Sequence, residues 1–167
     1  MNSYAAELLK AYRRKGVLVD TNILLLYFVG AVNPDRIARF KRTNSFNADD
    51  YTLLCDVLLA FRDRIVTTPN VLTEVNSLIN QLGEPERSQC LAIFSRLLAQ
   101  FDERYVQSKA TSRNEAFTRF GLTDCSIFET AQGQYLVLTD DLKLAAYLQR
   151  QGVDTVNFNN LRVYGWS

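Results

Sequence analysis

Short apolar runs and longer apolar stripes alternate along this chain. The run Val17-Leu18-Val19 is followed at once by Asp20-Thr21-Asn22, which predicts a buried strand whose end carries an acid. Further short apolar runs lie at residues 65–68, 135–139 and 153–158. No Asn-Gly pair joins two of these runs, so the pattern does not favour β-hairpins.

Apolar stripes with three- and four-residue spacing predict helices between these strands. The expected helices span residues 3–15, 23–29, 47–61, 69–82, 84–106, 112–121, 123–132 and 142–150. We expect Gly30 to end the second helix, and Asn47 to cap the third with Asp50 at its N3 position. Because helices and strands alternate, the sequence predicts an α/β fold with a parallel sheet covered by helices on both faces.

The segment 31–46 differs from the rest of the chain. It begins with the turn signal Asn33-Pro34-Asp35 and contains four basic residues close together, Arg36, Arg39, Lys41 and Arg42. We expect it to be a basic excursion from the core. With 167 residues, the chain is expected to form a single domain over 1–167, in which 1–16 supplies an N-terminal helix.

The composition fits an ordinary globular protein, with 47% hydrophobic and 22% charged residues. The net charge of +1 neither requires nor excludes nucleic acid, so any basic surface must be local. The start of the chain lacks the pattern of a signal peptide, and the apolar run 23–29 is too short to span a bilayer. We therefore expect a cytoplasmic protein.

Cysteine and histidine usage narrows the chemistry. The three cysteines, Cys55, Cys90 and Cys125, fall within helical patterns, which favours reduced thiols in a cytoplasmic protein. The chain has no histidine and no close cysteine pair, so a zinc site and the usual Ser-His or Cys-His nucleophilic schemes are not expected.

Two acids lie on apolar helical faces, where carboxylates are rare without a partner. Glu74 stands three residues after Val71 and four before Leu78, and Asp124 precedes Ile127 by three residues. Residues so spaced share one side of a helix. A helix that follows a strand begins near the carboxyl edge of the sheet, so both acids are expected to face that edge.

Other acids reach the same edge directly. Asp20 and the pair Asp140-Asp141 follow two of the predicted strands, and the chemistry of parallel sheets gathers where strands end. Several carboxylates buried together repel one another, and a divalent cation offsets that repulsion. Oxygen ligands favour Mg²⁺ or Mn²⁺ over zinc. Such ions activate water for attack on a phosphodiester.

Each acid also has a structural interpretation. Asp20 could cap the following helix, Asp124 could favour a helix N-terminus through the dipole, and Asp140 could be an N-cap. Glu74 has no such explanation, because it lies in the second turn on an apolar face and satisfies no cap. Their coincidence at one edge favours a functional site.

These residues resemble the PIN-domain nucleases, a family that includes the toxins of bacterial VapBC-type toxin–antitoxin pairs. The matching features are Val19-Asp20-Thr21-Asn22 after the first strand, Glu74 after the second strand, Thr123-Asp124 opening a helix, and Leu138-Thr139-Asp140-Asp141 closing a later strand. The resemblance covers residues 17 to about 158. It implies a three-layer α/β/α sandwich, a quartet of acids that binds Mg²⁺ or Mn²⁺, and endonucleolytic cleavage of RNA.

The resemblance also assigns residues by position. The quartet is Asp20, Glu74, Asp124 and an aspartate after Thr139. The family's Thr-x-Asp spacing favours Asp141, with Asp140 as a cap or a second ligand. Asn22 and Thr139 correspond to polar residues that support the acids through hydrogen bonds.

RNA contacts would come from basic residues that bind phosphates. The candidates are Arg36, Arg39, Lys41 and Arg42 in one cluster, and Arg113 and Arg119 nearer Asp124. Each cluster could instead be a solvated face. Phe40, Phe46 and Phe120 could stack on unpaired bases, although such residues more often belong to a core.

Three further alternatives stay open. The chain could be a toxin with an antitoxin partner, or a stand-alone nuclease or RNA-processing enzyme, and dimers are common in the family. DNA or structured flaps could replace RNA as the substrate. A PIN-like module that binds RNA or protein without cutting would keep the fold alone. A haloacid-dehalogenase phosphatase is not favoured, because Asn22 stands where that family has a second Asp.

Overall fold

A five-stranded, all-parallel sheet forms the centre of the protein, with the strand order β3-β2-β1-β4-β5. The computed structural model describes residues 3–164, so residues 1–2 and 165–167 of the expected domain lie outside the described residues. The strands are β1 Val17–Val19, β2 Ile65–Thr67, β3 Asp102–Glu103, β4 Leu136–Thr139 and β5 Thr155–Asn157. The expected α/β fold with a parallel sheet is confirmed.

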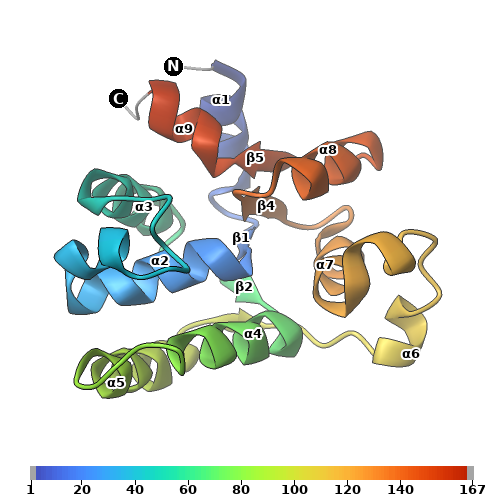
Figure 1. Ribbon diagram of the computed structural model, residues 1–167. Helices are drawn as coiled ribbons and strands as arrows, with labels where there is room; N and C mark the ends of the chain where they lie inside the picture. The colour runs from blue at the N-terminus through green and yellow to red at the C-terminus, as the bar shows by residue number, and fades with distance from the viewer. Residues whose placement is uncertain (1–2, 165–167) are drawn as a thin grey trace.

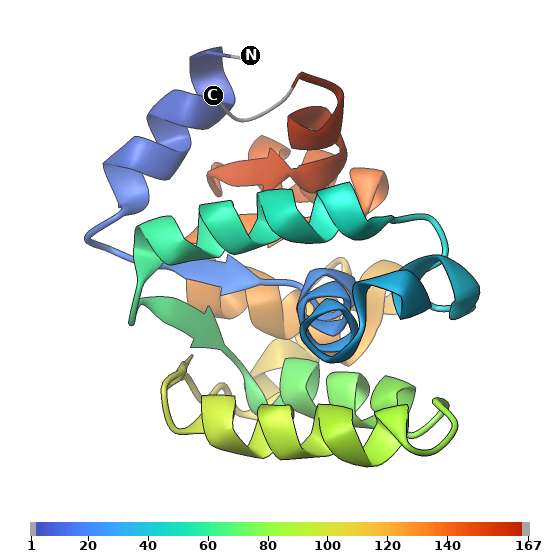
Figure 2. The same ribbon diagram turned by 90° about the vertical axis from the view of Figure 1, so that its left-hand side faces the viewer.

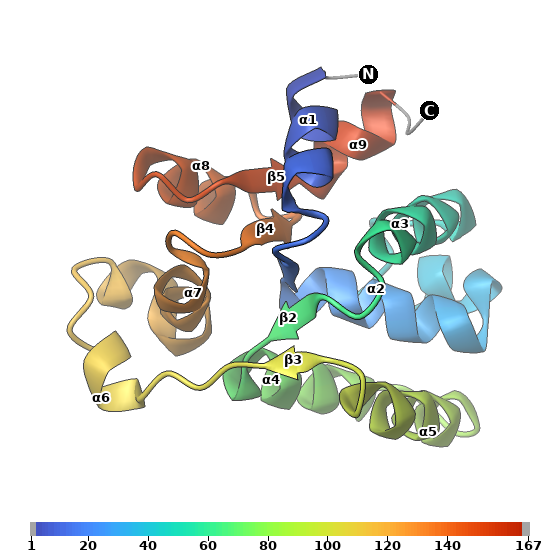
Figure 3. The same ribbon diagram turned by 180° about the vertical axis from the view of Figure 1, so that it is seen from behind.

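Helices cover both faces of this sheet. They are α1 Ser3–Tyr12, α2 Thr21–Val32, the 3-10 helix η1 Pro34–Arg39, α3 Ala48–Phe61, α4 Pro69–Ile79, α5 Glu86–Leu98, α6 Ser108–Thr111, α7 Phe117–Ala131, α8 Leu142–Arg150 and α9 Phe158–Tyr164. Views from the front and from behind place α2, α3 and α5 on one side, and α6, α7 and α8 on the other (Figures 1 and 3). Figure 2 faces the first side and shows α2 nearly end-on.

The chain order creates a switch point next to β1. The chain passes from β1 to β2 and β3 on one side, then returns to β4 on the other side of β1. In parallel α/β sheets, the crevice at the carboxyl ends of the two strands that flank such a point is the usual binding site. Asp20 follows β1 and Asp140 follows β4, so both acids reach that crevice.

Buried apolar residues explain why β1 and α2 are fixed. All three residues of β1 are fully buried, and so are the side chains from Ile23 to Leu26. Burying one such side chain stabilises the fold by roughly 1.5–3 kcal/mol. The expected capping box is confirmed at α3, where Asn47 and Asp50 each accept a hydrogen bond from the other's backbone N–H.

Gly30 does not end the second helix, contrary to the prediction from the sequence. Helix α2 runs through this residue to Val32, and the ring of Tyr51 on α3 packs directly against the Gly30 backbone. The missing side chain therefore allows close approach of two helices and does not mark a helix end.

The prediction of one helix over 84–106 is also wrong. Helix α5 ends at Leu98, and Asp102–Glu103 forms the edge strand β3, which pairs in parallel with Val66 and Thr67 of β2. The Arg104 N–H continues the pairing by donating to the Thr67 carbonyl at 2.9 Å. Pairing with a distant strand outweighs the helical spacing of Phe101 and Tyr105.

The two helices expected at 112–121 and 123–132 are divided differently. Helix α6 ends at Thr111, and α7 begins at Phe117 and continues to Ala131 with a kink at Gly121, whose φ is 80°. The Ser112 hydroxyl donates to the Lys109 carbonyl at 2.9 Å and does not cap a following helix. The predicted helix start at residue 112 is therefore wrong.

The segment 31–46 is not an excursion from the core. Its side chains Ile37, Phe40 and Phe46 are buried, and the buried Thr43 hydroxyl donates to the Ile37 carbonyl at 2.8 Å. Aromatic and aliphatic anchors between the basic residues hold the segment against the domain. Two further bounds differ from the prediction. Helix α4 ends at Ile79, before the expected residue 82, and α9 begins at residue 158, where the last apolar run was expected to end.

The three cysteines are free and lie on helices as the patterns predict; Cys90 and Cys125 are buried, whereas Cys55 is half-buried. Among residues 3–164, no helix is both long enough and apolar enough to cross a membrane.

Substitution of Gly30 tests the close contact between α2 and α3. A Cβ at this position would collide with the ring of Tyr51, so the ring or the helix must move. We expect Gly30→Ala to lower the free energy of unfolding by about 1–3 kcal/mol in urea titrations. Gly83→Ala is the matched control, because a Cβ there meets nothing within 4 Å. Equal stabilities of the two variants would contradict this packing argument.

Candidate functional site

The Asp20 carboxylate is fixed between the end of β1 and the start of α2. It is the N-cap of α2, and its Oδ1 accepts from the Thr21 N–H at 2.7 Å. Its Oδ2 accepts from the Thr139 hydroxyl at 2.6 Å, across the gap to β4. Only 7% of Asp20 is exposed. Thr139 therefore contacts the acid directly and holds its carboxylate in one orientation.

Glu74 comes to the same region from the second turn of α4. Its Oε2 accepts from the Thr21 hydroxyl at 3.0 Å, and its Oε1 accepts from the Thr123 hydroxyl at 2.7 Å. Figures 1 and 3 show α4 beside both α2 and α7, which supply these hydroxyls. Glu74 is exposed, so the expectation that it lies on the buried face is wrong. It lies where α4 meets α2 and α7, among polar side chains.

Asp124 is half-buried on α7, just beyond the kink at Gly121. Within residues 3–164, no hydrogen-bond donor reaches its carboxylate. Burial, with added repulsion from the charges of Asp20, Asp141 and Glu74, raises the pKa of Asp124 to about 7. Asp20, Asp141 and Glu74 therefore lie within electrostatic reach of Asp124.

The two aspartates after β4 have distinct contacts. Asp141 caps α8, because its Oδ1 accepts from the N–H groups of Lys143 at 2.7 Å and Leu144 at 3.0 Å. The interpretation of Asp140 as the N-cap is therefore wrong, since the residue directly before α8 takes that role. Asp140 instead accepts from the Asn22 side chain, through a long hydrogen bond of 3.4 Å.

No acid of the site forms an ion pair within residues 3–164, although the charge of Arg162 lowers the pKa of Asp140. Among residues 3–164, the ion pairs are Arg36–Glu86, Arg87–Glu84, Arg104–Asp102 and Arg162–Asp50. None includes an acid of the site. Burial raises the pKa of Asp20 to about 6, although the hydrogen bonds from Thr139 and Thr21 lower it and the charges of Asp140 and Asp141 add to the rise. Burial also raises the pKa of Asp140.

The donor set suits a hard divalent cation. Four or five carboxylates without a cationic partner leave a negative charge that such an ion would offset, and oxygen donors are its preferred ligands. Within residues 3–164, however, no three acidic or thiol side chains are arranged so that they could hold one ion. Binding would have to draw the carboxylates closer together.

Within residues 3–164, the contacts of the predicted RNA-binding residues do not include the acids of the site. Arg36 pairs with Glu86 at 4.0 Å, and Arg42 donates to Gln81 at 2.8 Å. Arg119 lies over the ring of Phe120 at 4.8 Å. The other candidates, Arg39, Lys41 and Arg113, are exposed, and none of the six pairs with an acid of the site.

The aromatic residues considered for base stacking belong to the core. Phe40 and Phe46 are buried. Phe120 is half-buried against the ring of Tyr147, with 5.0 Å between the ring centroids. The stacking interpretation is therefore wrong for Phe40 and Phe46, because neither ring has an open face of any size.

Sequence reasoning missed the hydroxyl groups that hold Glu74. The sequence marks Thr21 and Thr123 only as neighbours of acids, and Thr123 as a helix cap. Their side chains instead reach across to α4. The Asn159 side chain was also missed, and it donates to the Asp140 carbonyl at 3.0 Å. The threonines that stand next to these acids in the sequence could have indicated such hydrogen bonds.

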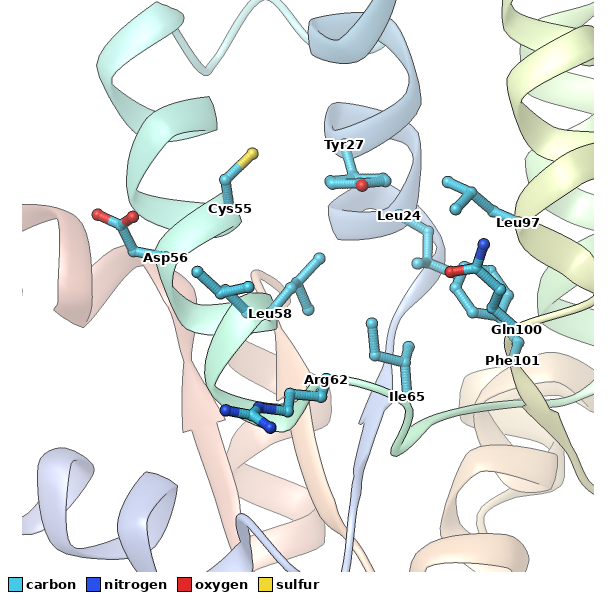
Figure 4. A pocket seen from close by; sticks show the side chains of 11 residues that line it. Leu24, Tyr27, Cys55, Asp56, Leu58, Arg62, Ile65, Leu97, Gln100 and Phe101 are labelled. Atoms are coloured by element: carbon cyan, nitrogen blue, oxygen red, sulfur yellow. The ribbon is translucent and has the colours of Figure 1, made fainter.

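An apolar pocket of about 380 Å³ lies elsewhere, between α2, α3 and α5. Figure 4 shows Tyr27, Leu58 and Phe101 around it, with Arg62 at its edge. None of the site acids lines this pocket. Its lining is mainly hydrophobic, so it offers no alternative cluster of acids for chemistry.

Comparisons of the chain with protein-family models, with curated proteins and with solved structures find no match.

The pKa of Asp20 makes stability depend on pH in metal-free protein. The pKa rises from 3.8 to about 6 on folding, so the folded state binds the proton more tightly. The protonated Asp20 carboxyl group contributes its full share to the free energy of unfolding below pH 4. This contribution is lost as the pH rises through 6 and the group ionises. In EDTA, we expect Asp20→Asn to be more stable than wild type at pH 8, by on the order of 1–3 kcal/mol.

At pH 5 the difference should shrink, because Asp20 of the wild type is then mostly protonated. Urea unfolding of both proteins at the two pH values measures the effect. A variant that is destabilised equally at pH 5 and pH 8 would show that the charge of Asp20 does not destabilise the folded state.

Proposed function

We propose that this protein is a divalent-metal-dependent endonuclease of the PIN-domain type that cleaves RNA. One observation carries the proposal. Asp20, Glu74, Asp124 and the Asp140-Asp141 pair come from four separate parts of the chain to one edge of a parallel sheet, and no cation within residues 3–164 pairs with them. Unneutralised acids at a switch point suit a site that binds metal and phosphate.

The order and setting of the acids support the resemblance. Asp20 follows the first strand, Glu74 lies in the helix after the second strand, and Asp124 lies in the helix before β4. The sheet order places β4 beside β1, so the last aspartates come next to Asp20. RNA as the substrate follows from the resemblance, and DNA is the alternative that the same assay compares.

Asp20 and Asp124 would be the central ligands, together with Asp140 or Asp141. A bound Mg²⁺ or Mn²⁺ would supply an activated water and stabilise the leaving oxygen. Thr139 holds the Asp20 carboxylate in place and also accepts from the Asp141 N–H at 3.0 Å. This hydroxyl therefore orients the Asp20 carboxylate, as groups behind metal ligands commonly do, and it also fixes the backbone of Asp141.

Glu74 would act at the rim of the site. Both of its oxygens already accept hydrogen bonds, from Thr21 and from Thr123. An ion that drew Glu74 inward would have to compete with these two hydroxyls. Apart from them, the side chain has no donor among the described residues to hold it.

A second candidate function is a PIN-like module that binds RNA or protein and cuts nothing. The observation that favours it is the lack of three ready-placed acidic ligands within residues 3–164. A metal-binding measurement separates the two functions, because a binding module has no need of an ion.

Cleavage assays test the proposed chemistry. We expect wild type to cut a labelled single-stranded RNA in Mn²⁺ and not in EDTA. Asp20→Asn and Asp124→Asn should each lower the rate by more than roughly 100-fold, because each removes a charged ligand. Circular dichroism should show both variants folded.

Asp56→Asn is the matched control for cleavage. Asp56 is exposed on α3 and lies outside the site, so this variant should cut at the wild-type rate. If all four proteins cut equally, the activity comes from a contaminant and the proposal is wrong. A parallel assay with DNA of the same sequence compares the two substrates.

Metal binding should raise thermal stability. We expect millimolar Mn²⁺ to raise the Tm of wild type at pH 7.5, because binding to the folded state alone shifts unfolding by mass action. Asp20→Asn should abolish most of this shift, whereas Asp56→Asn should keep it. Calorimetric titration that finds no Mn²⁺ binding to wild type would favour the non-catalytic module.

A further inference from the structure

A hollow lined by basic residues lies at the opposite end of the sheet from the acids. Its volume is about 660 Å³, and its lining combines the end of α1 with the turn between α3 and β2. The charged lining residues are Lys10, Arg13, Arg14, Arg62, Asp63 and Arg64. We call this set the basic hollow. It holds five positive charges against one negative charge, on a chain whose net charge is only +1.

None of the five cations forms an ion pair. Within residues 3–164, the ion pairs involve other residues, and all five side chains are exposed. Cations near the C-terminal ends of α1 and α3 interact favourably with the helix dipoles. That effect fades beyond the last turn, and Arg64 lies past the end of α3, just before β2. Helix stabilisation therefore does not account for the whole cluster.

Backbone contacts hold the two halves of the hollow together. Arg13 Nε donates to the Ala60 carbonyl at 3.4 Å, which ties α1 to α3. The Val17 N–H donates to the Arg64 carbonyl at 3.0 Å, where β1 and β2 begin. The backbone that carries the cations is therefore fixed by hydrogen bonds. Less conformational entropy is then lost when a ligand binds.

Arg62 occupies a conformation that glycine would adopt more easily. Its φ is 51°, the one positive value among the non-glycine residues 3–164. Its N–H satisfies the end of α3 by donating to the Leu58 and Leu59 carbonyls. Figure 4 shows its guanidinium turned away from Tyr27 and Phe101 of the apolar pocket. A residue kept in such a conformation at an exposed turn is a reason to look for function.

We infer that the basic hollow binds the phosphate backbone of the RNA strand, away from the position of cleavage. The choice of ligand rests on the proposed ribonuclease function. Closely spaced lysines and arginines bind phosphates without reading sequence. The hollow lies outside both basic clusters that the sequence suggested.

The geometry sets a minimum length for the substrate. From Gly16, at the amino end of β1, to Asp20 the chain advances four residues, which is roughly 13 Å in a strand. Strand β1 is fully buried, so an RNA that reached both edges would follow a longer path over the surface. Only an RNA longer than this span can occupy the hollow and the acidic site together.

Binding in EDTA tests the inference without cleavage. Anisotropy of a fluorescein-labelled 20-nucleotide single-stranded RNA gives Kd at several salt concentrations. We expect Arg13→Ala/Arg14→Ala to bind roughly tenfold more weakly than wild type. Its plot of log affinity against log salt should be shallower by about 1.4, because each of the two phosphates that it no longer neutralises accounts for about 0.7 of the slope.

Arg62→Gly separates binding from folding. Glycine accepts the positive φ, so the Tm should stay level or rise while the affinity for RNA falls about threefold. Arg96→Ala/Lys109→Ala is the matched control, because it also removes two exposed positive charges but from α5 and α6, outside the hollow and both basic clusters. Its affinity should change less than twofold.

Three outcomes overturn the inference. The first is RNA binding by the hollow variants as tight as that of wild type, and the second is an equal fall in affinity for the control. A third arm uses inorganic tripolyphosphate: weaker binding of this anion by the variants, with unchanged RNA affinity, would assign the hollow to a free polyphosphate. RNA binding through the hollow, combined with no cleavage by wild type, would reject the proposed nuclease and leave this inference standing.

Discussion

Burial of carboxylates that form no ion pair within residues 3–164 governs the edge of this sheet. Asp20 is almost fully buried, yet the only hydrogen-bond donors to its carboxylate among the described residues are a backbone N–H and a hydroxyl. Burial and neighbouring charge raise the pKa of Asp20 to about 6 and that of Asp124 to about 7. Burying charged carboxylates destabilises the folded state unless another interaction, such as binding of a cation, offsets the lost hydration. The proposed metal site follows from this imbalance.

Threonine hydroxyls organise the acids without neutralising them. Thr139 donates to Asp20, while Thr21 and Thr123 donate to Glu74. Each bond joins elements that are distant in sequence, so the hydroxyls tie β1, α4, α7 and β4 into one edge. Neutral donors fix the direction of a carboxylate and lower its pKa slightly. They leave its charge available for a ligand, which a lysine or arginine would not.

Parallel strands also separate charges of opposite sign. Every carboxyl end points to one edge, and the acids follow β1 and β4 there. The amino ends of β1 and β2 lie at the opposite edge, beside the basic hollow. The net charge of +1 conceals this polarity. An extended polyanion that touched both edges would meet cations for affinity and acids for chemistry, which connects the two proposals.

Local sequence patterns were sufficient to predict the helices and strands that have strong apolar or capping signals. The buried run before Asp20, the capping box at Asn47 and the alternation of helices and strands were enough to predict the parallel sheet and the acids that follow its strands. Tertiary structure decided the rest. Asp102–Glu103 forms a strand because β2 offers an edge to pair with, and Glu74 is exposed where α4 meets α2 and α7, whose threonine hydroxyls donate to it. Such contacts join residues far apart in sequence, so local spacing does not encode them.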